Sequence, residues 1–150
     1  MKLAIGCDDA AFALRDVLAE YILQSHPEIE LVDFGLQEDS GKDYPDVAIT
    51  VAEAVASGRV DRALLLCGTG LGVAIAANKV AGVRAATCHD VYSAQRAQLS
   101  NDAQIITMGA RVIGPELAKV VLDAYLSSSF AGGKSSDKVD KISAYEQTQH

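Results

Sequence analysis

The sequence predicts an α/β fold: one doubly wound, Rossmann-like sandwich around a five-stranded parallel sheet. Five short apolar runs recur along the chain, and a stretch with helical spacing follows each of them. The runs are almost continuously apolar, as is typical of parallel strands that are covered on both faces. Crossovers between parallel strands are right-handed almost without exception, so the helices should divide between the two faces.

The strands and helices follow from the local pattern. Leu14, Leu18 and Ile22 are spaced for one face of an amphipathic helix, and Pro45 and Pro115 each suit the first turn of a helix. Strands are predicted at residues 3–7, 30–34, 63–67, 84–88 and 104–108, and helices at 10–24, 45–56, 70–79, 92–99 and 115–126. We expect the strand order 2-1-3-4-5.

The polar tail after residue 126 admits two interpretations. The small-residue runs at 127–129 and 132–133 are typical of a flexible linker. Val139, Ile142 and Tyr145 instead recur at helical spacing, which predicts a helix over 137–147 with a narrow apolar stripe. We favour the C-terminal helix, and we expect residues 1–150 to form one domain whose segment 132–150 docks on a partner subunit.

Composition excludes several classes of partner. A net charge of −7 disfavours binding to nucleic acid and to anionic lipid surfaces. No apolar run approaches the roughly 18 residues of a membrane span, and residues 1–5 lack the features of a signal peptide. Three cysteines, an odd number, are better explained as free thiols than as disulfides. We therefore expect a cytoplasmic protein that binds a small molecule.

A candidate site lies at the ends of the first and third predicted strands. In open α/β sheets, ligands bind at the carboxyl ends of the strands, where the strand order reverses. The first strand ends in Cys7-Asp8-Asp9, and the third ends in Cys67 before the glycine-rich loop 68–72. Amides at the start of the next helix favour negative charge and the thiolate form of a cysteine. Cys67 is therefore a candidate base, and the alternative is a buried structural thiol.

The loop after Cys67 does not fit better-known glycine motifs. A dinucleotide fingerprint needs Gly or Ala five residues after Gly68, where this chain has Val73. A phosphate-binding P-loop needs Gly-Lys-Ser or Gly-Lys-Thr at its end, which is missing. A thiol phosphatase needs an arginine a few residues after the cysteine, where the chain has Leu71, Val73 and Ala74 instead.

Several short segments, spread over nearly the whole chain, form a more specific pattern. They are Gly6-Cys7-Asp8, Asp43-Tyr44-Pro45, Cys67-Gly68-Thr69-Gly70, Ile75-Ala76-Ala77-Asn78-Lys79, Tyr92-Ser93-Ala94, Ser100-Asn101-Asp102, Gly109-Ala110-Arg111-Val112-Ile113-Gly114 and Glu116-Leu117-Ala118. Together they resemble the type B ribose-5-phosphate isomerases and their relatives, the galactose-6-phosphate isomerase subunits. The resemblance implies an aldose–ketose isomerase of a phosphorylated sugar, with no metal and no organic cofactor. It also implies a homodimer, possibly paired into a tetramer, with active sites built from both subunits.

The resemblance further implies roles for individual residues. With Cys67 and Val73 the chain is similar to members in which a cysteine moves a proton between C1 and C2 of the open sugar. Cys67 is then the catalytic base, and Thr69 with the amides of residues 70–72 stabilises the enediolate. Lys134 and Lys138 stand where relatives carry phosphate-binding arginines from the partner subunit. The candidate substrate-binding residues are Asp8, Asp9, Gly68, Gly70, Gly72, Ser100, Asn101, Arg111, Lys134 and Lys138.

Two departures from the family bear on the substrate. Relatives usually carry histidine at the positions of Asp9 and Ser100, and the second of these histidines is assigned to opening the cyclic sugar. Of the histidines present, we expect only His89 to approach the crevice. A tetrose 4-phosphate cannot close a furanose ring, because the hydroxyl that would close it is esterified. We therefore favour a tetrose and tetrulose 4-phosphate pair, such as erythrose and erythrulose 4-phosphate, over ribose 5-phosphate.

Two other functions stay open. The missing histidines also suit a sensor that binds a sugar phosphate without catalysis, since one fold hosts many functions. The galactose-6-phosphate isomerase relatives suggest instead one subunit of a hetero-oligomeric isomerase.

Overall fold

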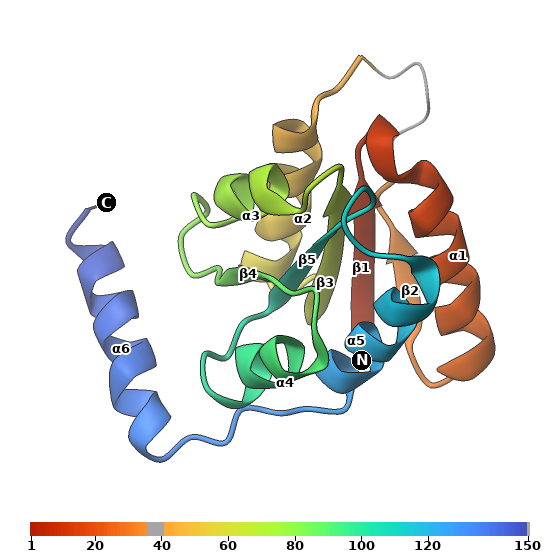
Figure 1. The fold of residues 1–150 in the computed structure, drawn as a ribbon. Helices are drawn as coiled ribbons and strands as arrows, with labels where there is room; N and C mark the ends of the chain where they lie inside the picture. Colours follow the sequence, from red (N-terminus) through yellow and green to blue (C-terminus); the bar gives the residue numbers. More distant parts are fainter. Residues whose placement is uncertain (36–40, 150) are drawn as a thin grey trace.

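The computed structural model describes residues 1–35 and 41–149 of the chain, and Figure 1 shows a parallel sheet between two layers of helices. The strands are β1 (Lys2–Cys7), β2 (Glu30–Asp33), β3 (Arg62–Cys67), β4 (Ala85–Thr87) and β5 (Ile105–Gly109). Every strand pair is parallel. The predicted doubly wound α/β fold is confirmed.

The order of the strands is β2-β1-β3-β5-β4, so the expected order 2-1-3-4-5 is wrong at one edge. β5 lies between β3 and β4, and all of its residues are buried. β4 has three partly buried residues, Ala85 to Thr87, and forms the edge. The longer and more apolar strand gains more from the centre of the sheet, whereas a short strand is well suited to an edge. The reversal of strand order between β1 and β3 is as expected.

The helices divide between the two faces of the sheet. They are η1 (Asp9–Ala11), α1 (Phe12–Ser25), α2 (Tyr44–Ala56), α3 (Leu71–Ala77), α4 (Val91–Leu99), α5 (Pro115–Leu126) and α6 (Lys134–Gln147). On one face, α1, α4 and α5 pack through residues such as Leu18 and Leu122 against Leu64 of β3. On the other, α2 and α3 pack through Val51 and Val73 against Leu65. Alternate residues of β3 therefore enter opposite cores.

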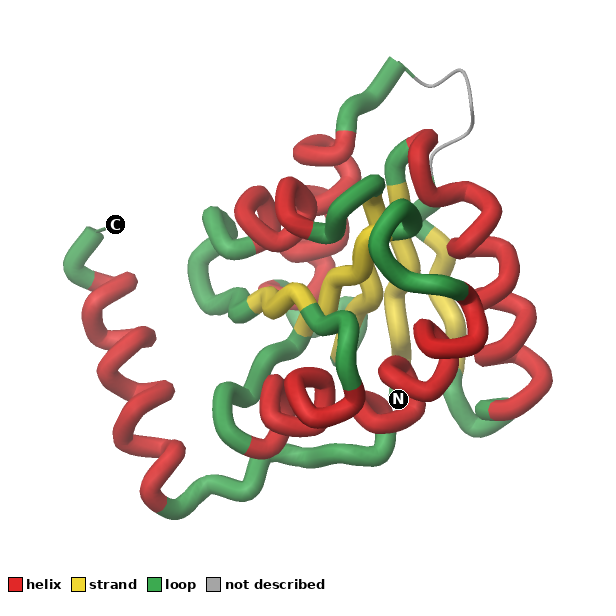
Figure 2. Tube along the Cα trace, in the orientation of Figure 1, coloured by secondary structure: helices red, strands yellow, loops and turns green. Residues whose placement is uncertain are grey.

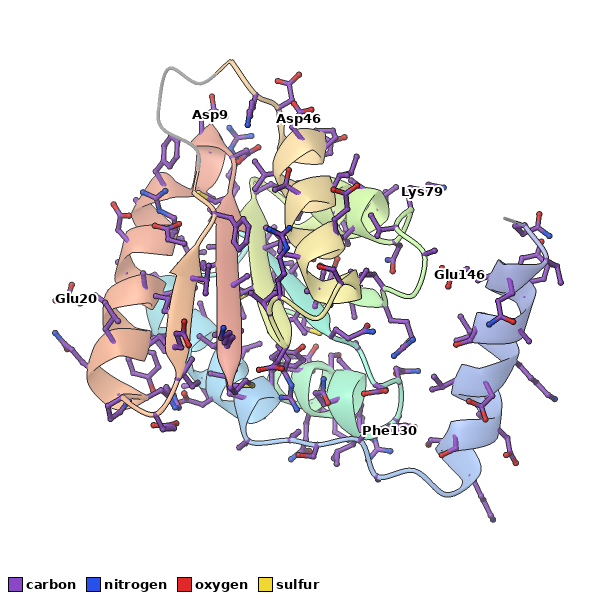
Figure 3. The ribbon with its side chains drawn as sticks, turned by 180° about the vertical axis from the view of Figure 1, so that it is seen from behind. Asp9, Glu20, Asp46, Lys79, Phe130 and Glu146 are labelled. Carbon is purple, nitrogen blue, oxygen red and sulfur yellow. The ribbon has the colours of Figure 1, made fainter. Side chains whose placement is uncertain are left out.

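The C-terminal helix α6 stands apart from the other helices (Figures 1 and 3). It begins at Lys134, three residues before the expected start. Gly82 donates its backbone N–H to Glu146 of α6 at 2.8 Å. Ile142 and Tyr145 are 53% and 68% exposed, so most of the predicted apolar stripe is uncovered within the chain. Docking of this helix on a partner subunit stays a prediction. No helix in the described parts of the chain is long and apolar enough to cross a membrane.

Candidate active site

A pocket of about 350 Å³ opens at the carboxyl ends of β1 and β3. Loops gather at this edge of the sheet (Figure 2), and Asp9 and Asp46 both lie there (Figure 3). The pocket is lined by Asp8, Asp9, Ala10, Tyr44, Cys67, Gly68, Thr69, Gly72 and Arg111. The structure therefore brings together most of the residues that the sequence proposed for one crevice.

Cys67 ends β3 and is 4% exposed. Gly70 donates its N–H to the Cys67 Sγ atom at 3.1 Å, and Leu71 donates its N–H to Thr69 Oγ1 at 3.2 Å. We expected the amides of residues 70–72 to face a ligand, but these two are committed to protein acceptors. The Gly70 amide is instead placed to stabilise negative charge on the sulfur, and Thr69 keeps a hydroxyl proton to donate.

The loop from Cys67 to Gly72 rests on β5. Gly70 has φ of 77°, and a Cβ atom there would lie 2.8 Å from the backbone carbon of Met108. A Cβ atom on Gly109 would lie 2.5 Å from the backbone of Thr69. Such close approach of two main chains requires glycine at both positions. Ala110 donates its N–H to the Cys67 carbonyl at 2.8 Å, which ties β5 to the thiol-bearing residue.

Two carboxylates and one guanidinium face the thiol. Asp8 accepts a hydrogen bond from the Ala10 N–H at 3.0 Å, and Asp9 beside it is exposed. Burial is the main reason why the pKa of Asp8 is raised; the Ala10 hydrogen bond opposes it, the charge of Asp9 adds to it, and the charge of Arg111 opposes it. The pocket thus holds two acids and one cation from this chain.

Replacing Asp8 with asparagine should stabilise the fold at neutral pH. A raised folded-state pKa means that the stabilising contribution is present while Asp8 is protonated, and is lost as pH rises through that pKa. Asparagine keeps an oxygen for the Ala10 N–H and removes the poorly solvated charge. We expect the melting temperature of Asp8→Asn to rise by about 1–3 °C at pH 7 and by less at pH 4, measured by circular dichroism.

The exposed Asp140 of α6 provides the matched control for this experiment. Asp140→Asn should leave the melting temperature nearly unchanged at both pH values, because exposed single charges contribute little. A lower melting temperature for Asp8→Asn at pH 7 would show that ionised Asp8 stabilises the fold.

The other two cysteines are unsuited to proton transfer. Cys7, Cys67 and Cys88 are all free, as predicted. Burial raises the pKa of the Cys7 thiol and that of the Cys88 thiol to about 11 each. Both therefore stay protonated at neutral pH, and neither lines the pocket. Cys67 is the one thiol that a ligand in this pocket can reach.

Tyr44 is a pocket residue that the sequence reasoning missed. Asp43 and Asp46 cap the start of α2, with the Asp43 N–H donating to Asp46 Oδ2 at 3.0 Å, and this cap places Tyr44 at the site edge. A Cβ atom on Gly72 would lie 2.5 Å from the Tyr44 ring, so the missing side chain of Gly72 makes room for the ring. The segment Asp43-Tyr44-Pro45 marked a helix start but not its position near the crevice.

None of the histidines that the structure describes lines the pocket. His89 accepts a hydrogen bond from the Gly109 N–H at its Nε2 atom, at 2.8 Å. His26 lies at the far end of α1, where its Nε2 atom is 2.8 Å from Asp123 Oδ1. The sequence predicts that His89 approaches the crevice. His89 contacts Gly109, the sheet partner of Cys67, without lining the pocket itself. His150 lies outside the described residues.

Five predicted site residues do not line the pocket: Gly70, which belongs to the loop 68–72 beside it, and four residues that lie away from it. Ser100 and Asn101 follow α4, and the Asn101 carbonyl accepts a hydrogen bond at 3.1 Å from Arg84, directly before β4. That position is at the amino end of β4, whereas Cys67 lies at the carboxyl end of β3. Lys134 and Lys138 are exposed on α6. One chain therefore supplies Asp8, Asp9, Arg111 and the thiol loop, but not these four residues.

The arrangement suits proton transfer at carbon. A thiol that accepts a backbone N–H lies beside a hydroxyl donor, and carboxylates that can accept hydrogen bonds from hydroxyl groups line the same pocket. In residues 1–35 and 41–149, no group of three His, Cys, Asp or Glu side chains is placed to hold a metal ion. These groups are chemically suited to a small polyhydroxylated molecule that loses a proton from carbon.

Comparisons with known proteins show which isomerases the chain is similar to. The chain matches the ribose/galactose isomerase family over residues 3–142. A D-erythrulose-4-phosphate isomerase of Pectobacterium atrosepticum is 49% identical, over 99% of this chain and 97% of that protein. A ribose-5-P isomerase B of Listeria innocua is also 49% identical, over 98% of each. The solved ribose-5-phosphate isomerase B of Clostridium thermocellum matches with a TM-score of 0.95 at 41% identity, over 100% of both chains.

Proposed function

We propose that this chain, which belongs to the ribose/galactose isomerase family, interconverts the aldose and ketose forms of a tetrose 4-phosphate. The protein is a sugar-phosphate isomerase. The pocket at the carboxyl ends of β1 and β3 is its proposed active site, and Cys67 is its proposed base.

The reaction moves protons without any change in the number of atoms or electrons. From the ketose, the Cys67 thiolate takes a proton from C1, and the electron pair left on carbon forms the enediolate with C2. The thiol then returns a proton to C2, while the hydroxyl proton on O1 is replaced by one on O2. The same steps in reverse convert the aldose to the ketose. The Gly70 N–H, 3.1 Å from the sulfur, supports the thiolate before each proton is removed.

The neighbouring side chains hold and polarise the sugar. Thr69 accepts the Leu71 N–H, so its own O–H can donate to the enediolate oxygen. Asp8 accepts hydrogen bonds from sugar hydroxyls. Arg111 supplies positive charge beside Gly68 and offsets the charge that develops on the enediolate.

A second copy of the chain completes the proposed site. The pocket of one chain holds two carboxylates and one cation, which is a poor environment for a phosphate dianion. Lys134 and Lys138 are exposed on the outlying helix α6, and Ser100 and Asn101 lie far from the Cys67 of their own chain. We infer that a partner subunit of a homodimer brings these residues to the pocket, with Lys134 and Lys138 at the phosphate and Ser100 and Asn101 beside the sugar carbons.

The choice of substrate rests on the two described histidines, neither of which lines the pocket. His89 and His26 are both hydrogen-bonded elsewhere, and Ser100 cannot exchange protons near neutral pH as a histidine does. A tetrose 4-phosphate needs no ring opening, so it can react in this site. The relatives support both possible substrates, because the two that are 49% identical have names that give different sugars.

The experiment compares two substrates with the purified chain. We expect kcat/KM for D-erythrulose 4-phosphate to exceed that for ribose 5-phosphate by about tenfold or more, because ring opening needs acid–base catalysis that the site lacks. In D2O, the product erythrose 4-phosphate should carry deuterium at C2. A preference for ribose 5-phosphate would overturn the tetrose assignment. Absence of both turnover and deuterium would favour a sensor or a hetero-oligomer.

A gain-of-function variant sharpens the test. Ser100→His should raise kcat/KM for ribose 5-phosphate relative to kcat/KM for erythrulose 4-phosphate, because only the first substrate needs ring opening. Ser129→His, at an exposed position of the linker before α6, is the matched control. Equal effects of the two variants would contradict the role assigned to position 100.

A further inference from the structure

Two threonines hold the carbonyl oxygen of Gly70. Thr107 of β5 donates its hydroxyl to this oxygen at 2.6 Å, and Thr87 of β4 donates to the same oxygen at 3.2 Å. The two hydroxyl oxygens are 2.9 Å apart, and the residues are directly opposite in the β4–β5 register. Thr107 is fully buried. We call this pair the threonine clamp.

The clamped residue lies between two peptide groups that both serve the thiol loop. On one side, the Gly70 N–H donates to Cys67 Sγ at 3.1 Å. On the other, the Leu71 N–H shares a peptide plane with the clamped carbonyl and donates to Thr69 Oγ1 at 3.2 Å. The clamped carbonyl therefore fixes the direction of the Leu71 N–H directly, because both lie in one peptide plane. It restrains the Gly70 N–H, which lies in the preceding peptide plane, through the φ and ψ angles of Gly70.

Gly70 needs such a restraint more than another residue would. Its φ of 77° is open to glycine, but a glycine also visits many other conformations at similar energy. Buried hydroxyl groups that lose their acceptor are costly, so the clamp penalises any rotation that turns the Gly70 carbonyl away. The clamp thus selects one backbone conformation among the many that glycine allows.

We propose that Thr107 and Thr87 are positioning residues that fix Gly70, so that its amide stabilises the Cys67 thiolate and the Thr69 hydroxyl keeps its proton for the substrate. The proposal rests on the proposed function only in taking Cys67 as the base. It assigns a catalytic purpose to two strand residues that line no part of the pocket.

The test measures the thiolate directly. Thr107→Val and Thr87→Val replace each hydroxyl with a methyl group of similar size, and Thr107→Ser keeps the hydroxyl. We expect the double valine variant to react with iodoacetamide at Cys67 roughly tenfold more slowly at pH 7, the scale of one lost hydrogen bond to a charged group. The kcat should fall by a similar factor with little change in KM, and Thr107→Ser should react faster than Thr107→Val.

Two features separate positioning from a general loss of structure. Cys7 and Cys88 do not compete for the reagent, because burial raises the pKa of each to about 11. The slowing should shrink at pH 9.5, whereas a blocked pocket would slow the reaction equally at both pH values. A folded double variant that reacts at the wild-type rate would overturn the proposal. If the double variant does not fold, equal rates for Thr107→Val and Thr107→Ser would overturn it.

Alkylation needs no substrate, so the two proposals fail separately. Slower alkylation in a protein that isomerises no sugar would keep the clamp and refute the proposed function. If instead the double valine variant were alkylated at the wild-type rate, and the Cys67 variants still lost turnover as expected, the proposed function would stand and the clamp would be refuted.

Discussion

Cys67→Ala should lower kcat for isomerisation by about 10² to 10⁴-fold, the range that a positioned acid–base group contributes. The sulfur is the proposed base, and it lies in the pocket 3.1 Å from a supporting amide, the Gly70 N–H. Cys67→Ser should lose as much activity, because a hydroxyl keeps the hydrogen bond from Gly70 but ionises far less readily. Steady-state kinetics with erythrulose 4-phosphate gives the measurement.

Cys88→Ala is the control for the loss of a buried thiol. Cys88 is 2% exposed, lies outside the pocket and stays protonated at neutral pH, since burial raises its pKa to about 11. Its removal should cost some stability and leave kcat close to that of wild type. If Cys67→Ala kept more than about a tenth of the wild-type kcat, acid–base catalysis on the scale expected for this group would have to come from elsewhere.

Gly70→Ala should destabilise the fold by about 2–4 kcal/mol, because two costs combine at this residue. An alanine at φ of 77° is strained, and its Cβ atom would lie 2.8 Å from the Met108 backbone, which cannot move aside as a flexible side chain can. The loop must then leave β5, which breaks the threonine clamp and the hydrogen bond to Cys67. Urea unfolding gives the free energy, and kcat should fall as well.

Gly82→Ala separates the two costs. Gly82 has φ of 84°, and a Cβ atom there would meet no heavy atom within 4 Å. This variant should lose only about 1–2 kcal/mol, the cost of the backbone conformation alone. If both variants lost the same free energy, the close approach of Gly70 to β5 would have no energetic weight.

Most secondary structure could be predicted because its signals are local. The helix expected at 115–126 is α5, since Gly114-Pro115 fixes its start. β3 was expected at 63–67 and spans Arg62–Cys67, because an unbroken apolar run ends there at the thiol. The places of β4 and β5 could not be predicted, because hydrogen-bond partners across a sheet leave no trace in the periodicity of either strand.

The same holds for the site: the residues placed by local signals could be predicted, and those placed by tertiary contacts could not. Asp8 and the Cys67 loop could be placed together, since both follow central strands that end at one edge. The place of Tyr44 depends on how the start of α2 approaches that end of the sheet, and the place of His89 depends on which strand pairs with β3. Both places are set by tertiary contacts. The clamp on Gly70 also requires β5 beside β3, so the sequence indicated the thiol but not its supports.

The place of β5 between β3 and β4 also sets the order in which a newly made chain can become active. Cys67 leaves the ribosome about forty residues before Gly109, its partner in the sheet, and Ala85 about twenty before Ile105. Until β5 arrives, one edge of β3 is unpaired and β4 has no strand to join. Thr107, Gly109 and Arg111 all belong to this late segment or follow it directly. A growing chain can thus assemble β1, β2 and β3 early. Its thiol loop acquires its shape only when β5 pairs with both β3 and β4.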